Sequence, residues 1–193
     1  MIQNTYGRFL CIVTVALVSI FGGRLEAFAR NKAYIVNAAI VSEDPALKVS
    51  FAIENCFTQE MVEAVWSGVA TTFRFLALLE KPGFPLVREK MVDVSFEHSI
   101  RYDRIRNEFT VYLQEQPQRI RTTSDFDEAK QWMSEVKKLP LIPLWRLQVG
   151  EKYQLRVKAE LSKVQVPPFL RYIFFWVALW DFETEWYQET FTF

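Results

Sequence analysis

The feature that most constrains this chain is a strict alternation of apolar and polar side chains between residues 92 and 103. One side is formed by Val92, Val94, Phe96, His98, Ile100 and Tyr102. The other side is formed by Asp93, Ser95, Glu97, Ser99, Arg101 and Asp103. Because successive side chains of a β-strand point to opposite faces, this pattern predicts a sheet with one buried and one solvated face.

The same alternation recurs along the chain and predicts further strands. The repeats lie at residues 47–54, 69–77, 109–113, 152–161 and 181–193. Residues Asp103 to Asn107 have the composition of a hairpin turn between two of these strands. Half of the 193 residues are hydrophobic, which is enough to fill a core. We therefore expect a mainly β (α+β) fold, either an antiparallel β-sandwich or a twisted sheet, with about eight strands.

Two short helices are predicted between the strands. The first runs from Thr58, a plausible N-cap, to Gly68, a plausible C′ residue. The second starts after Ser124 and carries an apolar stripe at helical spacing. That stripe consists of Phe126, Ala129, Trp132, Met133 and Val136. The chain has 8 prolines, and we expect them, Pro140 after the second helix included, to mark breaks between the elements.

The N-terminus has the layout of a secretory signal peptide. Residues Phe9 to Phe21 form an apolar run, and a membrane-spanning helix would need about 20 such residues. Ala27-Phe28-Ala29 places small residues where a signal peptidase reads them, which predicts cleavage after Ala29. The expected organisation is a signal peptide at 1–29 and a single antiparallel β-rich domain at 30–193. Retention of the leader as an uncleaved membrane anchor is the alternative.

Charge and cysteine content exclude several classes of function. Lys+Arg and Asp+Glu both number 23, so no general field attracts nucleic acid. Cleavage would remove Cys11 and leave Cys56 without an internal disulfide partner, and we expect Cys56 to be a small buried residue. One histidine and one mature cysteine cannot form an ordinary structural zinc site. No phosphate-binding glycine loop or nucleophile elbow is present, so we expect no cofactor, no metal and no enzymatic activity.

Three sets of polar residues are candidate functional sites. His98 lies on the apolar side of its strand, which favours a packed histidine with one hydrogen bond over a general base. Asp181, Glu183 and Glu185 share one strand face, where they could hold calcium or form a glycosidase-like pair, but a solvated face is the simpler expectation. A candidate anion patch is formed by Arg101, Arg104 and Arg106, with a solvated turn as its alternative.

The segment from Pro167 to Trp180 is unusual because apolar and aromatic residues follow Arg171 without interruption as far as Trp180. It is too short to cross a bilayer, so it is either a buried strand or lid, or a surface that contacts a membrane or a partner. Tryptophan and tyrosine favour such half-hydrated positions. The candidate partner or membrane patch consists of Phe169, Tyr172, Phe174, Phe175, Trp176 and Trp180.

The chain resembles the bacterial family named domain of unknown function 4390. Three segments carry the resemblance: Phe51 to Thr72 with Val65-Trp66-Ser67-Gly68, Trp145 to Gly150 followed by Tyr153 to Leu161, and Leu179 to Tyr187. The resemblance implies an exported envelope protein, periplasmic or membrane-associated on the periplasmic side. Some members are encoded near two-component sensor kinases, which implies an envelope or inner-membrane protein as partner. The family brings no catalytic residues.

The expected function is a non-enzymatic interaction or signalling-accessory module of the cell envelope. The first alternative is a binder of lipid or another apolar ligand, which would need a sizeable apolar cavity instead of a filled core. The second is a hydrolase that uses the C-terminal acidic strand, which would need three carboxylates converging in a cleft.

Overall fold

The computed structural model of the chain describes residues 32–83, 87–162 and 183–193. The chain divides into two units, Met1–Asn31 and Lys32–Phe193, and every described element belongs to the second. The predicted signal peptide therefore lies outside the described residues. Among these residues, no helix is both long enough and apolar enough to cross a membrane.

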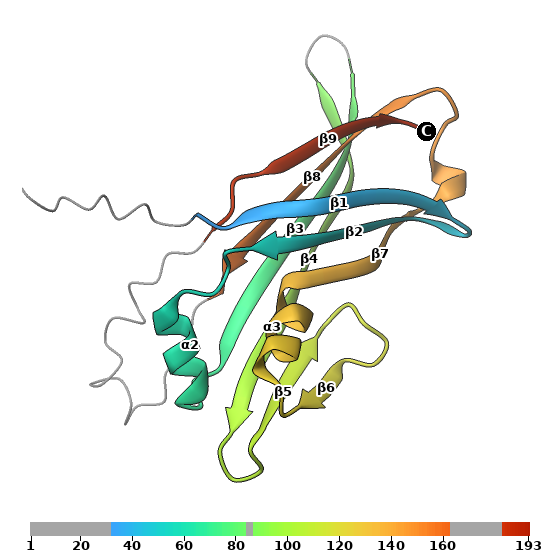
Figure 1. Ribbon diagram of the computed structural model, residues 1–193. Coiled ribbons are helices and arrows are strands. Elements are labelled where there is room, and N and C mark those ends of the chain that lie inside the picture. Colours follow the sequence, from blue (N-terminus) through green and yellow to red (C-terminus); the bar gives the residue numbers. More distant parts are fainter. Residues whose placement is uncertain (1–31, 84–86, 163–182) are drawn as a thin grey trace, which may run out of the picture. The chain divides into compact units, whose positions relative to one another are not determined.

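The described residues form nine strands in two antiparallel sheets (Figure 1). The smaller sheet has the order β1-β2-β7 and consists of β1 (Tyr34–Glu43), β2 (Ala46–Glu54) and β7 (Glu135–Pro143). The larger has the order β6-β5-β4-β3-β8-β9. Its strands are β3 (Thr71–Pro82), β4 (Arg88–Asp103), β5 (Glu108–Leu113), β6 (Ile120–Thr123), β8 (Lys152–Leu161) and β9 (Tyr187–Thr192). The predicted mainly β sandwich with two short helices is confirmed.

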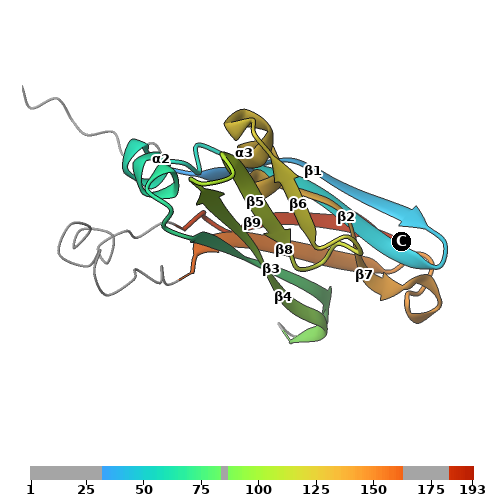
Figure 2. The same ribbon diagram turned by 90° about the horizontal axis from the view of Figure 1, so that it is seen from below.

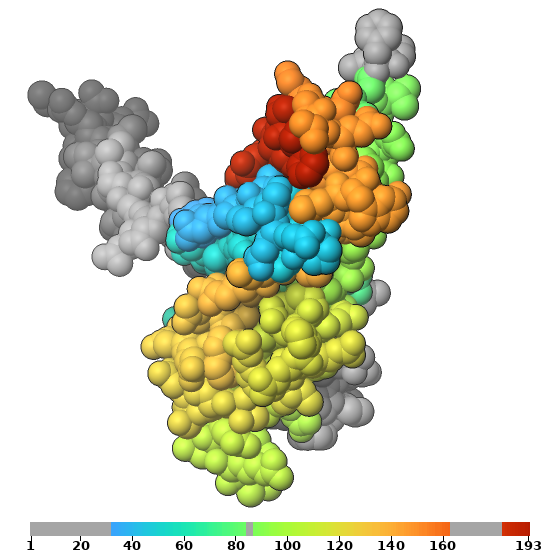
Figure 3. Space-filling view, turned by 90° about the vertical axis from the view of Figure 1, so that its right-hand side faces the viewer, coloured from blue at the N-terminus to red at the C-terminus, as the bar shows by residue number. Residues whose placement is uncertain are grey.

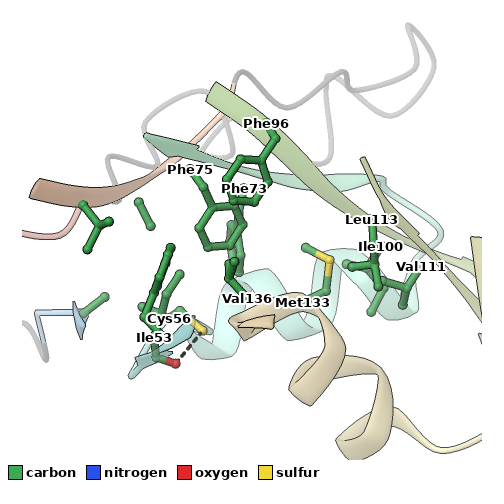
Figure 4. Close-up of a cluster of buried hydrophobic side chains, with 14 of the residues drawn as sticks. Ile53, Cys56, Phe73, Phe75, Phe96, Ile100, Val111, Leu113, Met133 and Val136 are labelled. Atoms are coloured by element: carbon green, nitrogen blue, oxygen red, sulfur yellow. Dashed lines mark hydrogen bonds between the residues drawn. The ribbon is translucent and has the colours of Figure 1, made fainter. Parts of the chain in front are cut away.

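The core lies between the inner faces of the two sheets, where alternate residues of β2, β3, β5, β8 and the second half of β4 are buried. Phe75 of β3 stacks on Phe96 of β4 with ring centroids 5.1 Å apart, and it meets Phe51 of β2 across the sandwich at 6.0 Å. Figure 4 shows Phe73, Phe75 and Phe96 of the larger sheet opposite Ile53, Cys56 and Val136. The alternation seen in the sequence therefore builds the main apolar cluster between the sheets.

The hairpin predicted at Asp103 to Asn107 is present between β4 and β5. The Asp103 carboxylate accepts hydrogen bonds from the backbone N–H groups of Ile105 at 2.9 Å and Arg106 at 3.1 Å. Asn107 adopts φ 56, the left-handed conformation that asparagine tolerates better than most residues. The turn chemistry thus agrees with the sequence.

The first helix, α2 (Gln59–Trp66), has the predicted caps. The Thr58 side chain accepts from the Met61 N–H at 3.3 Å, and Gly68 has the positive φ of a helix-ending glycine. The second helix, α3 (Phe126–Ser134), is capped by Asp125 and not by Ser124 as expected. Asp125 is the N-cap because its carboxylate accepts hydrogen bonds from the backbone N–H groups of both Asp127 and Glu128.

The prediction that Pro140 breaks the chain after the second helix was wrong. The helix stops at Ser134, and Val136 and Pro140 belong to β7, which follows directly. β7 is an edge strand that pairs only with β2, and its register shifts near Pro140. An edge strand tolerates proline because one side of its backbone needs no ladder hydrogen bonds. Val136 is still buried, but from a strand.

The strands run between two ends that differ in content. The helical end carries α2, the β4–β5 hairpin and the start of α3. The loop end carries the β1–β2 turn, the β3–β4 hairpin and the 144–151 loop between β7 and β8. Figure 2 shows α2 and this loop at opposite ends of the sheets.

Cys56 should be chemically inert in the folded domain. It is buried, and burial raises the pKa of its thiol to about 12, so almost none of the reactive thiolate exists at neutral pH. In a Cys11→Ala variant, a maleimide reagent should leave the native protein unlabelled and should label it stoichiometrically in urea. Rapid labelling of the native Cys11→Ala protein would contradict the burial of Cys56.

Candidate functional site

His98 of β4 is fully buried and has two polar partners, where the sequence led us to expect one. Its Nδ1 lies 3.1 Å from the carbonyl oxygen of Met133 at the end of α3. Its Nε2 lies 2.9 Å from Oε2 of Glu115, whose side chain is only 5% exposed. Because a carbonyl oxygen can only accept, Nδ1 must carry a proton.

The Glu115 carboxyl is held in its charged form. Burial by itself would raise its pKa, but the hydrogen bond and the charge of His98, with further hydrogen bonds from the backbone and from Gln116, lower the pKa below its ordinary value. The contact of 2.9 Å between Nε2 and Oε2 of Glu115 joins the two buried side chains. With both nitrogens engaged, the pair ties β4 and the chain after β5 to α3, and neither nitrogen is free to act as a base.

The three arginines of the predicted anion patch are exposed near the tip of the β4–β5 hairpin. Arg106 forms ion pairs with Asp103 at 4.0 Å and with Glu108 at 3.9 Å. Arg104 donates through Nε to the carbonyl of Trp66 at 3.3 Å, and Arg101 lies on β4. Acidic first-turn residues of α2 and α3 also occupy this end, namely Glu60, Asp127 and Glu128. The arginines are brought together, but within an acidic setting that does not favour an anion.

The acidic residues of the C-terminal stretch lie on the surface. Glu183 is 2.7 Å from the Lys158 ammonium, whose hydrogen bond and charge lower the pKa of its carboxyl. Glu185 lies 3.6 Å from Lys32. A general acid needs a raised pKa, and each of these exposed carboxylates has its own lysine instead. The third residue of this group, Asp181, lies outside the described residues.

The six residues of the predicted partner or membrane patch also lie outside the described residues. They are Phe169, Tyr172, Phe174, Phe175, Trp176 and Trp180. In the part of the chain that the structure does describe, no three His, Cys, Asp or Glu side chains gather into a group that could hold a metal ion. The geometry therefore directs attention to apolar side chains on the surface.

The 144–151 loop presents two apolar side chains to solvent. Trp145 in the 3-10 turn Leu144–Arg146 is 81% exposed, and Val149 is 89% exposed. The loop is nevertheless held firmly. Leu147 is buried in a small apolar cluster with Tyr153, and the Gln148 N–H donates to the Tyr153 hydroxyl at 2.8 Å. Trp145 and Val149 project from an anchored loop.

Further backbone hydrogen bonds fix the same loop to its neighbours. The Leu144 N–H donates to the Pro45 carbonyl in the β1–β2 turn at 3.0 Å, and the Gly150 N–H donates to the Phe193 carbonyl at 2.7 Å. The space-filling view in Figure 3 shows the loop (orange) beside the β1–β2 turn (cyan). The conformation that exposes Trp145 is thus set by contacts at both ends of the loop.

Basic side chains surround the exposed apolar ones. Lys81 donates to Gln148 at 2.8 Å and pairs with Glu151 at 3.4 Å, which ties the β3–β4 hairpin, with its 64% exposed Val87, to the 144–151 loop. Arg146 and Lys152 are exposed and have no ion-pair partner among the residues that the structure describes. We define the loop-end surface as Val87, Trp145, Arg146, Val149 and Lys152.

The alternation pattern and the motifs of the sequence do not predict this surface. Trp145 to Gly150 was expected only to be one of the segments that carry the family resemblance. A signal was present, because Pro143 and Gly150 bracket a short stretch between two alternating segments. Connections of this kind run over the surface, so a tryptophan within one is exposed more often than a tryptophan in a strand.

Comparison with known proteins gives one match. The model of a family described as "Domain of unknown function (DUF4390)" matches residues 30–190. No curated protein and no solved structure matches the chain.

The His98–Glu115 pair should make stability depend on pH. Replacing Glu115 with Gln removes the charged acceptor from a buried histidine, and we expect the free energy of unfolding at pH 7 to fall by about 2 kcal/mol. Because folding lowers the pKa of Glu115, its contribution is present above the unfolded-state value of 4.5 and is lost as the pH falls through the lower folded-state value.

Urea unfolding at several pH values measures this effect. The difference between wild type and the Glu115→Gln variant should shrink as the pH is lowered from 4.5. The exposed Glu89 gives a matched control, because Glu89→Gln should show almost no difference at any pH. A Glu115→Gln difference that is independent of pH would contradict the charged pair.

Proposed function

The chain belongs to the family of domain of unknown function 4390, and we propose that it acts as a non-enzymatic interaction module of the bacterial cell envelope. The loop-end surface is the observation that carries this proposal. A rigid loop that holds Trp145 and Val149 in solvent loses the free energy of burying them unless another surface covers them. Aromatic side chains beside arginine are also the composition enriched where proteins meet partners.

The polar groups support binding over catalysis. His98 and Glu115 contact each other in the core, and Glu183 and Arg106 are paired with residues of opposite charge at the surface. A catalytic group must face a substrate, and these four face other parts of the chain. Among the residues that the structure describes, no group of side chains favours the hydrolase alternative.

The core supports an interaction module over a binder of an apolar ligand. Between the sheets, the rings of Phe51, Phe75 and Phe96 contact one another where such a ligand would have to lie. Side chains of this size from both inner faces fill the layer, as they do in ordinary close-packed cores.

The predicted leader supports the envelope as the proposed place of action. The leader has the length and the terminal small residues of a signal peptide, and the family match starts at residue 30, directly after the predicted cleavage position. An envelope or inner-membrane protein is the partner class that the family resemblance suggests, with sensor kinases as the first to test.

Export is tested by cell fractionation and N-terminal sequencing. We expect the mature protein in the periplasmic or membrane fraction with Arg30 as its first residue, because Ala27 and Ala29 form the peptidase signal. Ala29→Lys should block processing and leave a longer, membrane-bound product. Recovery of a folded cytosolic protein with an intact N-terminus would refute the assignment to the envelope.

The interaction surface is tested by photocrosslinking in living cells. A photoreactive amino acid at position 149 should form adducts with envelope components, and Trp145→Ser should reduce their yield several-fold by removing the central contact. The same probe at position 105 is the matched control, because Ile105 is 97% exposed at the opposite end. Equal adducts from positions 149 and 105, or none from either, would contradict the proposal.

A further inference from the structure

We propose that the loop-end surface seats the domain on an anionic phospholipid bilayer, an inference that rests on the proposed function and names the surface this module contacts. Trp145 and Val149 would enter the headgroup region, and Arg146 and Lys152 would lie against the phosphates. The geometry of the apolar tips, the local charge and the rigidity of the loop each support this assignment.

The apolar side chains are separate tips and not a face. Trp145, Val149 and Val87 are 81%, 89% and 64% exposed, so each stands clear of the surface around it. A protein partner binds through a broad, closely fitting interface, of which these few exposed side chains would form only a part. The headgroup region of a bilayer deforms around single side chains, and tryptophan prefers that region because one edge of its ring is polar.

The local charge suits an anionic surface. Residues 144–152 together with Lys81 contain three basic side chains, Lys81, Arg146 and Lys152, and one acidic side chain, Glu151. Lys81 pairs with Glu151, which leaves Arg146 and Lys152 free of ion pairs among the described residues. The neighbouring turns add the acidic residues Glu43, Asp44 and Glu89, and Glu43 is paired with Lys48 and Lys138. They also add Arg88 and Lys90, which are paired with Glu80 and Asp93. Free basic residues beside an inserted aromatic are the usual requirement for binding anionic headgroups.

The helical end has an equally exposed apolar tip with different neighbours. Ile105 is 97% exposed, the adjacent Arg106 is paired with Asp103 and Glu108, and Arg101 and Arg104 have no ion pair among the described residues. The first turn of α3 at the same end adds Asp127 and Glu128. Exposure and unpaired basic residues therefore occur at both ends, and the loop end differs in presenting a tryptophan, which prefers the headgroup region, directly beside Arg146.

The rigidity of the loop favours binding without a cost of ordering. The hydrogen bonds of Leu144, Gln148 and Gly150 hold the backbone on both sides of the exposed residues. A loop whose conformation is already fixed before binding loses little conformational entropy when it meets the membrane. This distinguishes the loop from a flexible tip whose apolar side chains would fold back onto the domain.

Flotation with lipid vesicles tests the proposal. The protein is purified from cells as it is found there, with its leader cleaved or retained. Wild type should float with phosphatidylcholine vesicles that contain about 30% phosphatidylglycerol and much less with phosphatidylcholine alone. Trp145→Ser should weaken binding to the anionic vesicles about tenfold, and Arg146→Glu should abolish the preference for them. Ile105→Ser should bind as wild type does, and the unfolding transitions of all variants should coincide.

The outcomes separate this inference from the proposed function. If wild type fails to float, or if Trp145→Ser and Arg146→Glu bind as wild type does, the bilayer assignment is overturned. If position 149 still forms adducts with an envelope protein in that case, the interaction module stands with a protein as its partner. If the adducts are absent too, both proposals fall.

Discussion

The structure depends on the contact between the inner faces of the two sheets, centred on Phe51, Phe75 and Phe96. Cys56 is a free thiol, so neither a disulfide from this residue nor a metal group among the described residues supports the fold. Apolar burial between the sheets stabilises the fold, and the alternation of side chains in β3, β4 and β8 provides it.

A core of this kind determines what the rest of the molecule can do. The buried contact between His98 and Glu115 joins α3 to the larger sheet, because the other ring nitrogen of His98 lies against the Met133 carbonyl. Buried charges are tolerated only when they are paired and hydrogen-bonded, so these two residues are committed to structure. The other titratable groups discussed above lie at the surface, where Glu183 and Arg106 are paired with neighbours of opposite charge.

The two ends of the sandwich use their connections differently. At the helical end, Trp66 packs on Tyr102 and Phe109 with ring centroids 4.7 and 4.9 Å apart, so its ring helps to close the core. At the loop end, Leu147 and Tyr153 fill a second apolar cluster and leave Trp145 outside it. A tryptophan that an ordered loop holds in solvent is typical of a binding surface, whereas a tryptophan that covers a core stabilises the fold.

The sequence alone determined the local features of this protein. The alternation of apolar and polar side chains predicted strands such as β2 and β4. Thr58 and Gly68 marked the ends of α2, and Asp103 to Asn107 formed the expected turn. These succeed because each depends on neighbours within a few residues. Resemblance over three segments also identified the family that the match to residues 30–190 supports.

Only the tertiary structure decided which residues meet. The partner of His98 is Glu115, 17 positions away, and Lys81 reaches Gln148 across 67 positions. The second helix ended early because β7 had to pair with β2, a competition that no local pattern reveals. The exposure of Trp145 likewise follows from Leu147 filling the cluster beneath it. Contacts between distant segments set these features, and the order of apolar and polar residues does not specify such contacts.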